Sequence, residues 1–521
     1  MSHPLITTIT KYSHYFTIRN PTRNILPLVY KLSANYTQFG MEFDRVTRRK
    51  QWRPLKTFGI YVDHGREFRF HIGQLPELMD ALNRAYIEPS SYEIIETQLY
   101  EGDSIDIKLQ PQWKLYPEQE EAKDFIVNSH EIENNSPMIM IATGGGKTVV
   151  AMSAVAELGK RFAVRVQAQY VDKWISDITS ILNIEPSEIC VIQGSDALMR
   201  ATNYPGSGLP MPKAFVISIA TMSKWYKLYE EDMNNPLLEA YACMPYDFCQ
   251  HLGLGVEVYD EVHQHPHAVY RGYTYTHIPK TISLSATLLS KDPTLKKVQS
   301  MMFPRFKRFD KIRMEKYITI HACAYQVVDF ARSKLRTTEW GQNTYSHTAF
   351  EKSILSHKTI RKQYLTMISD LADEAYKQIK VGNDKLLIFV ASKIMAIAVV
   401  QHLKNKWPNL DIRKYMQEDD YKDILEPDIC VTTVLSGGTA IDIPGLRATI
   451  QTINLDSPIA NVQSLGRLRK IKHRDHDNDV HFYYLYCSTI PKHVEYHENR
   501  KELFADRALE QKQRFLKTIY P

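Results

Sequence analysis

The sequence predicts an α/β protein built on parallel sheets, and three stretches carry that prediction. Residues 138–141 read as a short buried strand, glycines follow, and the chain from Thr148 onward has helical spacing. A strand predicted to be buried at 256–259 is followed by two carboxylates, and 385–403 again has the pattern of strand, turn and helix. Repeated strand and helix units joined by short turns are typical of parallel sheets covered by helices.

Length and composition limit the class of protein. The 521 residues suffice for about three domains, and 44% hydrophobic with 24% charged residues is typical of a globular protein. The sequence has no apolar run of about 18 residues and no signal-peptide pattern at its start. Six scattered cysteines without a CxxC pair fit reduced thiols. We therefore expect no membrane segment and a cytoplasmic location, which is the host-cell cytoplasm if the protein is viral.

The basic residues gather near the N-terminus. The whole chain has a formal charge of only 65 − 59 = +6, but residues 1–70 hold 12 Lys/Arg against 4 Asp/Glu, a local excess of 12 − 4 = +8. Arg48, Arg49 and Lys50 lie in its densest part. Such a patch attracts phosphates, so these three are candidate nucleic-acid contacts. A solvated basic face explains the same pattern equally well.

Residues 1–110 are expected to form a small basic α+β domain. Aromatic and basic residues alternate there, which suits base stacking with phosphate contact, although an aromatic in a strand is more often part of a core. Apolar and polar alternation predicts strands at 15–20, 28–36, 57–64 and 67–73, and helical spacing predicts a helix at 75–86.

The glycine-rich stretch predicts a phosphate loop. Backbone N–H groups of such a loop and of the following helix bind phosphate, with Lys147 reaching the β- and γ-phosphates and Thr148 holding Mg²⁺. The strict pattern has glycine where Ile141 stands, so a glycine-rich turn without a ligand is the alternative. Upstream, Gln119 is a candidate for the adenine edge or a solvent-facing helix residue. The candidate nucleotide-binding residues here are Gln119, Thr143, Gly144, Gly145, Gly146, Lys147 and Thr148.

Two further strands should end on the same rim of the sheet. Residues 162–178 read as strand and helix, and 214–225 as a strand ending in Ala220, Thr221 and Ser223. Between them, the Gly/Pro-rich residues 201–213 are expected to be a flexible loop. In an open parallel sheet this rim is where ligands bind.

The carboxylates Asp260 and Glu261 follow the strand at 256–259. An Asp at a strand end suits Mg²⁺ shared with phosphates, and the next Glu can orient a water. His263 is then expected to act as a sensor. The trio His263, His265 and His267 also permits a zinc site, which we disfavour because Pro266 should break any helix there. Ser285 and Thr287 follow one strand later, as coupling hydroxyls or as a capped turn.

These stretches resemble a known family. ATGGGKT, DEVH and SAT, in this order, look like motifs I, II and III of superfamily 2 helicases and translocases of the DExH type. Residues 385–403 are similar to motif IV with Ser392, and 429–450 to motif V with Thr432 and Asp442. Residues 461–470 resemble motif VI, with Gln463 and Arg467.

Two departures from the family pattern stand in these motifs. The second family arginine of motif VI falls on Lys470, with Arg469 one residue early, so either side chain could take its role. We favour Arg469. Ala440 replaces a glycine that is frequent in motif V.

The resemblance implies two tandem RecA-like domains behind a small N-terminal α+β domain. We expect a basic nucleic-acid-binding domain at 1–110, an ATP-binding lobe at 111–310 and a second lobe at 311–521, with residues 489–521 a solvated helix. ATP and Mg²⁺ are the implied cofactors. The implied catalytic residues are Lys147, Asp260, Glu261, Gln463, Arg467 and Arg469; Thr148 and Asp260 would hold Mg²⁺, Asp442 would lie near the nucleotide, and Thr221, Ser392 and Thr432 would contact nucleic-acid phosphates.

The compact build looks similar to phage UvsW-type branch-migration helicases, whose relatives include the XPB and RecG groups. That likeness implies a monomer acting on forked, branched or single-stranded DNA in replication, recombination and repair, with RNA a less favoured partner. Three alternatives stay open. They are an RNA-directed or transcription-coupled helicase, a duplex translocase that does not unwind, and a non-catalytic scaffold.

Overall fold

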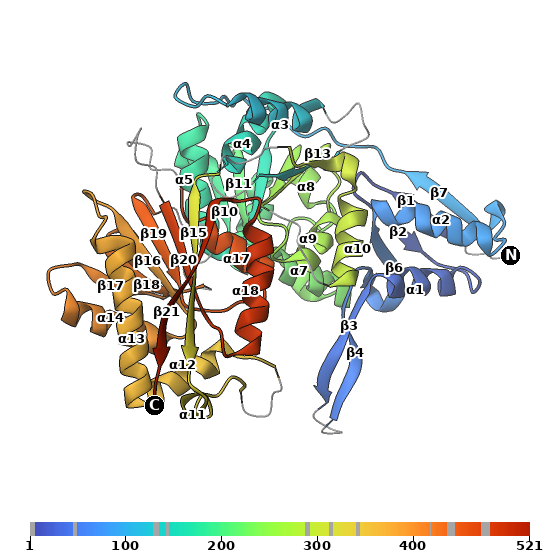
Figure 1. Ribbon diagram of the computed structural model, residues 1–521. Helices are drawn as coiled ribbons and strands as arrows, with labels where there is room; N and C mark the ends of the chain where they lie inside the picture. Colours follow the sequence, from blue (N-terminus) through green and yellow to red (C-terminus); the bar gives the residue numbers. More distant parts are fainter. Residues whose placement is uncertain are drawn as a thin grey trace. The chain divides into compact units, whose positions relative to one another are not determined.

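The computed structural model describes residues 6–44, 49–128, 135–141, 145–286, 292–311, 316–339, 344–416, 418–434, 443–469 and 480–521. The chain divides into two compact units, Met1–Ile312 (unit 1) and Arg313–Pro521 (unit 2). Each unit is built on its own seven-stranded parallel sheet (Figure 1). The predicted fold class, two tandem RecA-like sheets with a small N-terminal α+β region, is confirmed.

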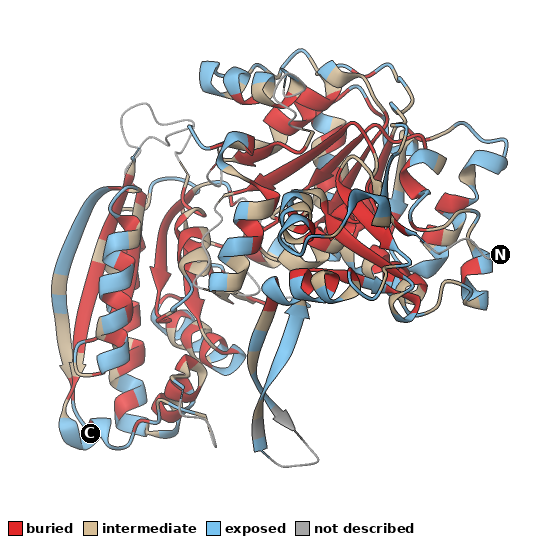
Figure 2. Ribbon diagram, turned by 90° about the vertical axis from the view of Figure 1, so that its right-hand side faces the viewer, coloured by how far each residue is buried: buried red, intermediate tan, exposed pale blue. Residues whose placement is uncertain are grey.

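The large sheet of unit 1 has the order β10-β11-β9-β12-β13-β8-β14. Most of its strands are buried on both faces because helices cover both, as Figure 2 shows. The strands are β8 (Met138–Met140), β9 (Phe162–Val166), β10 (Ile189–Ile192), β11 (Ala214–Ser218), β12 (Val256–Tyr259), β13 (Lys280–Ser285) and β14 (Arg308–Phe309). The helices are α3 (Pro117–Val127), α4 (Lys147–Leu158), α5 (Val171–Ile181), α6 (Ser195–Thr202), α7 (Ile219–Glu231), α8 (Phe248–His251), α9 (Pro266–Tyr273) and α10 (Pro293–Met302).

Two expectations about this sheet are wrong. The strand predicted at 214–225 ends at Ser218, and Ala220, Thr221 and Ser223 lie in the first turns of α7. Pro266 does not break a helix but begins α9, since proline is tolerated in a first turn, where its missing N–H costs nothing.

The N-terminal part of unit 1 is a five-stranded mixed sheet in the order β5-β6-β2-β1-β7. Its elements are β1 (Thr7–Lys11), β2 (Tyr15–Arg19), α1 (Leu26–Asn35), β5 (Ile60–Val62), β6 (Glu67–His71), α2 (Leu75–Arg84) and β7 (Tyr92–Glu96). A separate two-stranded ribbon, β3 (Thr37–Asp44) and β4 (Arg49–Thr57), follows α1. The predicted strand at 28–36 is wrong. Pro27 lies in the first turn of a helix that begins at Leu26, and Val29 and Leu32 share its buried face at helical spacing.

One continuous core joins this sheet to the rest of unit 1. At its centre the buried Arg69 guanidinium pairs with Glu67 at 2.5 Å and donates to the Thr274 carbonyl at 3.1 Å. The rings of Tyr15 and Tyr275 lie 5.4 and 4.4 Å from it. A buried cation held by one carboxylate and aromatic faces requires both parts of the fold to stay packed. The N-terminal sheet is therefore part of unit 1 and not a loosely tethered module.

The sheet of unit 2 has the order β17-β18-β16-β19-β20-β15-β21. Its strands are β15 (Ile318–Val327), β16 (Lys385–Val390), β17 (Ile412–Tyr415), β18 (Ile429–Thr433), β19 (Leu446–Gln451), β20 (Val480–Cys487) and β21 (Ala508–Ile519). Helices α11 (Asp329–Arg332), α12 (His347–Ser356), α13 (Lys358–Ala372), α14 (Lys393–Lys406), α15 (Lys422–Leu425), α17 (Pro458–Leu465) and α18 (Pro491–Phe504) accompany them. The expected helical tail is present only as α18, which has a buried face and is followed by β21, a strand that pairs with β15 along its length.

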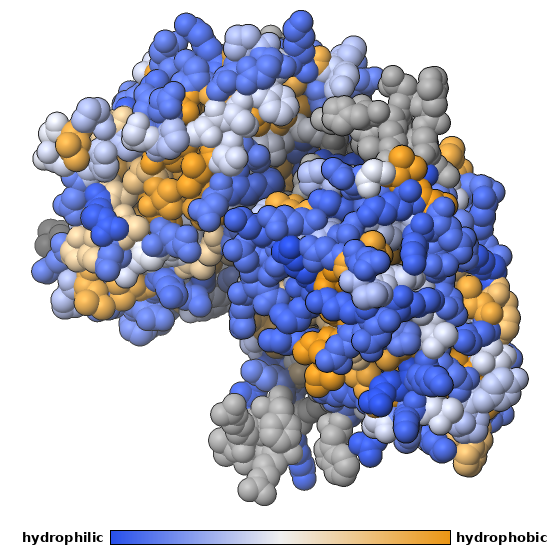
Figure 3. Space-filling view, turned by 90° about the vertical axis from the view of Figure 1, so that its left-hand side faces the viewer, coloured by the Kyte–Doolittle hydropathy of each residue, from blue (hydrophilic) through white to orange (hydrophobic). Residues whose placement is uncertain are grey.

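The face drawn in Figure 3 is mostly hydrophilic, with hydrophobic side chains in separate groups. Among the described residues, no helix combines the length and the apolar character that crossing a bilayer requires.

Candidate functional site

The phosphate loop joins β8 to α4. Gly146 caps α4 with φ +86°, a left-handed conformation that favours glycine, and a Cβ there would collide with Gln119 Nε2. Lys147 and Thr148 begin the helix, whose first backbone N–H groups have no partner within it. Thr143 and Gly144 lie outside the described residues.

Gln119 lies against this loop and does not face solvent. Its Nε2 donates to the Gly145 carbonyl at 2.9 Å, and its Oε1 accepts from the Tyr116 N–H at 3.0 Å. Both ends of the amide are thus engaged, so Gln119 ties the start of α3 to the loop. A contact with an adenine edge would have to share these bonds.

Lys147 and Glu261 form an ion pair across the site. The Lys147 ammonium lies 3.1 Å from Glu261 Oε1, and both side chains are largely buried. Glu261 has φ +47°, which is uncommon for a residue with a side chain. A residue in this strained backbone conformation at the end of β12 is typical of functional sites, where the surrounding structure requires it.

Asp260 is fixed by two hydrogen bonds. Its Oδ2 accepts from Trp174 Nε1 at 3.0 Å, and its Oδ1 accepts from the Glu261 N–H at 2.9 Å. Burial, and then the adjacent Glu261 charge, raise the pKa of the Asp260 carboxyl, while Lys147 acts in the opposite direction. The sequence analysis missed Trp174. The one indication in the sequence is that a buried indole N–H needs a hydrogen-bond acceptor.

His263 links the carboxylates to Ser285 at the end of β13. Its Nδ1 lies 2.7 Å from Ser285 Oγ and 3.3 Å from Glu261 Oε2. Burial, with Lys147 nearby, lowers the pKa of His263 to about 4, so the ring is neutral at pH 7. Through His263, a hydrogen bond and not an ion pair therefore connects motif II, which contains Asp260 and Glu261, to Ser285 of motif III. Thr287 lies outside the described residues.

The histidine trio does not converge. His267 Nε2 contacts the Thr57 carbonyl at 2.9 Å, whereas His263 bonds to Ser285. Among the residues that the structure describes, no group of three or more His, Cys, Asp or Glu side chains is arranged to hold a metal. The donors suited to Mg²⁺ are the Thr148 hydroxyl and the Asp260 carboxylate, since this ion prefers oxygen and few protein ligands. The raised pKa of Asp260 fits a carboxylate that a cation would stabilise.

The motif VI residues lie around α17 in unit 2. Gln463 is half-buried on the helix, Arg467 is buried just after it, and Arg469 is half-buried. Lys470 and Asp442 lie outside the described residues. The choice between Arg469 and Lys470 stays a prediction.

The hydroxyls expected to touch nucleic acid have structural partners. Thr221 Oγ1 accepts from the Gly194 N–H at 2.8 Å. Ser392 caps α14 and donates to Glu351 Oε2 at 2.8 Å, so its proton is committed within unit 2. Thr432 is fully buried in β18, which argues against a direct phosphate contact by its side chain.

The three basic candidates are only partly described. Arg49 is exposed on β4. Arg48 and the side chain of Lys50 lie outside the described part of the chain.

Comparison with known proteins adds the family. Residues 112–290 match the family model described as "Type III restriction enzyme, res subunit". No curated protein matches the chain in sequence. Three solved structures resemble it: T4 UvsW (13% identity, 98% of this chain and 100% of that one, TM-score 0.35), an HsdR subunit fragment of a type I restriction enzyme from Vibrio vulnificus YJ016 (14%, 96% and 88%, 0.49), and S. cerevisiae Dbp5 bound to RNA and ADP BeF3 (11%, 77% and 90%, 0.48).

Identities of 11–14% and TM-scores below 0.5 carry no argument about activity, so the assignment rests on the family match and the site within it. The matched segment contains the phosphate loop, the paired carboxylates and Ser285, in the order of the helicase motifs. Residues 112–290 therefore form a domain that matches this family, and the match supports the resemblance of its motifs to those of superfamily 2 helicases.

Proposed function

We propose that this protein is an ATP-dependent DNA helicase or translocase that remodels branched DNA. The observation that supports it most is the Lys147–Glu261 pair at 3.1 Å, beside Asp260 at the carboxyl end of β12. ATP use is implied by the family, whereas DNA as the polymer and branched DNA as its form are our proposals. They are motivated by the basic N-terminal region and by the motif order.

The chemistry follows from the ion pair. A bound γ-phosphate would compete for the Lys147 ammonium and release Glu261, whose carboxylate would then orient the attacking water. Thr148 and Asp260 would hold Mg²⁺, which when bound neutralises charge on the phosphates. The left-handed Gly146 lets the loop backbone approach those phosphates.

Unit 2 would complete the reaction. We propose that Arg467, with Arg469, stabilises charge on the transferred phosphate and that Gln463 helps to orient it. Replacing Arg467 by Ala should lower kcat while nucleotide binding is kept, because an interaction made only in the transition state is lost.

The structure changes how the candidate side chains are proposed to contact nucleic acid. Arg49 stays a candidate. Ser392 would contribute through the backbone amides of the turn that it caps, since its hydroxyl donates to Glu351, and Thr221, whose Oγ1 already accepts from the Gly194 N–H, through backbone amides near it. Deleting residues 1–110 would expose the core around Arg69, so point substitutions test this region more cleanly.

The test is steady-state ATP hydrolysis with equal phosphate concentrations of single-stranded DNA, blunt duplex, a four-way junction and single-stranded RNA. We expect the junction to stimulate turnover most, and Lys147→Ala to abolish it. Best stimulation by RNA would replace the DNA assignment with the RNA-directed alternative. Stimulation by blunt duplex without strand separation would indicate a duplex translocase, and absent turnover in the wild type would indicate a scaffold.

A further inference from the structure

The ribbon formed by β3 and β4, residues 37–57, projects from the body of unit 1 (Figure 1) and is exposed along most of its length (Figure 2). Two-stranded hairpins are marginal in water unless they pack on something. Among the described residues of this ribbon, the buried ones lie at its root, so the described outer part adds no side chain to the core. Its exposed side chains call for another explanation.

The two faces of the ribbon differ in chemistry. Met41 lies opposite Trp52, and Phe39 lies opposite Pro54, so cross-strand pairing places these side chains on one face. Trp52 is 66% exposed, Met41 56% and Phe39 43%. Large apolar side chains gathered on one exposed face are typical of a binding surface.

The charge of the ribbon indicates the kind of partner. Residues 37–57 contain six Lys/Arg against two Asp/Glu, an excess of 6 − 2 = +4. Arg49, Arg53 and Lys56 are exposed on β4, and Gly40 lies opposite Arg53 on the other face from Trp52. A ribbon with aromatic rings on one face and cations on the other can meet bases with the first face and phosphates with the second.

The root is bonded to three parts of unit 1. Gln38 Nε2 donates to Asp292 Oδ2 at 2.9 Å, and that Asp caps α10. On the other strand, the Thr57 carbonyl bonds to His267 at 2.9 Å. Just before β3, Glu77 accepts from Asn35 Nδ2 at 2.7 Å and from the Tyr36 hydroxyl at 2.8 Å.

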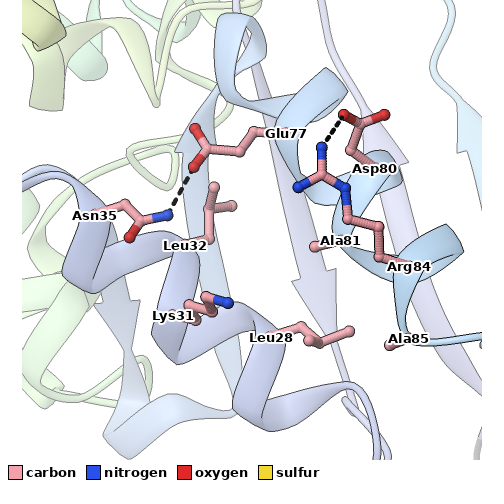
Figure 4. A pocket seen from close by; sticks show the side chains of 9 residues that line it. All are labelled: Leu28, Lys31, Leu32, Asn35, Glu77, Asp80, Ala81, Arg84 and Ala85. Carbon is pink, nitrogen blue, oxygen red and sulfur yellow. Dashed lines mark hydrogen bonds and ion pairs between the residues drawn. The ribbon is translucent and has the colours of Figure 1, made fainter.

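Figure 4 shows Glu77 and Asn35 in the groove of about 300 Å³ between α1 and α2. Glu77 bonds to Asn35 there, and Asp80 pairs with Arg84 at 3.3 Å. We therefore interpret this groove as part of the ribbon's support and not as a ligand site.

These bonds fix the ribbon relative to the nucleotide site. His267 lies in α9, the helix that begins five residues after Glu261, and Asp292 begins the helix that follows β13. The ring of Phe58 also packs edge-on against His267, with ring centres 5.3 Å apart. The ribbon is thus carried on the segments that follow the carboxylates and Ser285.

We infer that the ribbon is a DNA-engaging arm, and that its Phe39, Met41 and Trp52 face stacks on bases that become unpaired where a duplex opens. The inference rests on the proposed function. It adds to it a site that recognises the junction between duplex and single strand. Blunt duplex offers no unpaired base, so the apolar face should contribute little to binding it.

The test compares Trp52→Ala with Tyr86→Ala, a matched control. Tyr86 is 90% exposed in the same N-terminal region but lies after α2 and away from the ribbon. Binding is measured on a forked DNA with 2-aminopurine at the branch and on a blunt duplex of equal length. We expect Trp52→Ala to bind the fork about 10-fold more weakly, with the 2-aminopurine response reduced and duplex affinity within about twofold of wild type. Tyr86→Ala should match wild type, and basal ATP hydrolysis should be unchanged in both variants.

Wild-type fork affinity and 2-aminopurine response in Trp52→Ala would overturn the inference. Equal weakening on fork and duplex would overturn it too, because the side chain would then contact only the backbone. Loss of self-association in Trp52→Ala, with fork binding intact, would identify the face as a protein interface instead. If wild-type hydrolysis ignores every DNA, the proposed function fails; if it responds to DNA and Trp52→Ala behaves as wild type, only the arm fails.

Discussion

Trp174 on α5 donates its indole N–H to Asp260 Oδ2 across 3.0 Å, joining residues 86 positions apart. That bond favours the charged carboxylate, so its loss should raise the pKa of Asp260 further above its usual range. We expect Trp174→Phe to lower kcat roughly tenfold, since a hydrogen bond to a charged group contributes about 1.5–3 kcal/mol. The acid limb of the kcat profile should also move to higher pH.

Trp225→Phe is the control for that change. Trp225 is buried in the same unit, and its Nε1 has no hydrogen-bond partner within the described part of the chain. It should keep the wild-type pH profile. An unshifted acid limb in Trp174→Phe, or the same shift in both variants, would contradict the role of the Trp174–Asp260 bond.

Glu261→Gln should separate nucleotide binding from hydrolysis. The amide keeps the shape of the side chain but loses the charge that pairs with Lys147 and that would orient water. We expect turnover to fall by about 10²–10⁴-fold, the usual contribution of such a group, while fluorescent ATP analogues bind at least as tightly as before. Turnover within about threefold of wild type would remove Glu261 from the mechanism.

The parts of the fold that the sequence predicted well are those whose pattern is local. The predicted buried strands at 138–141 and 256–259 are found as β8 (Met138–Met140) and β12 (Val256–Tyr259), since parallel strands are buried on both faces. The glycines and the paired carboxylates could be placed for the same reason. Their functional side chains directly follow, in the sequence, the strand that positions them.

The parts that failed depend on distant residues. β21 is largely polar and exposed, and it is a strand because β15 supplies its hydrogen-bond partners. The ribbon was missed, although Phe39 and Met41 alternate with polar residues and glycine in β3. Thr432 was expected at a surface, but its side chain is fully buried in β18, an inner strand of the sheet. Trp174 could not be matched to Asp260 without the fold that brings α5 close to the end of β12.

Glu351 should make unit 2 less stable as the pH rises. Burial raises the pKa of this carboxyl to about 7, although the Ala391 N–H and the Ser392 hydroxyl donate to it. The pKa is higher in the folded state than in the unfolded state. Its stabilising effect is therefore present below about pH 4.5 and is lost as the pH passes through 7, by up to about 3 kcal/mol.

Glu351→Gln removes that titration. The free energy of unfolding of wild type relative to this variant should fall between pH 5 and 8, as measured by urea denaturation. Glu502→Gln, an exposed position on α18, should leave the wild-type dependence unchanged. A constant difference between wild type and Glu351→Gln would show that the carboxyl does not titrate in this range.

Buried histidines should make unit 1 sensitive to acid. Burial lowers the pKa of His14 to about 3, and that of His263 and His267 to about 4. Below pH 6.5 the unfolded chain binds protons that the folded chain excludes. Stability is therefore present above pH 6.5 and is lost as the pH falls toward 4, at ~1.4 kcal/mol for each unit of depression.

His267→Gln should flatten this loss between pH 6.5 and 4, because one of the excluded protons is removed from the balance. His64→Asn is the control. That ring is exposed, and asparagine tolerates its left-handed backbone at φ +57°. Equal slopes of unfolding free energy against pH in wild type and His267→Gln would contradict the prediction.

The buried pair of Arg165 and Glu257 lies under the site, between β9 and β12. Arg165 Nε donates to Glu257 Oε1 at 2.8 Å, and Thr276 donates to Glu257 Oε2 at 2.8 Å. Glu257→Ala should cost about 3–5 kcal/mol in unfolding free energy, because it leaves a buried guanidinium without its carboxylate. The double change Arg165→Met with Glu257→Leu should recover most of that loss, since two apolar side chains of similar volume need no partner. Denaturant unfolding of the three proteins measures this. A double variant as unstable as Glu257→Ala would mean that packing around β12, and not the unpaired charge, sets the cost.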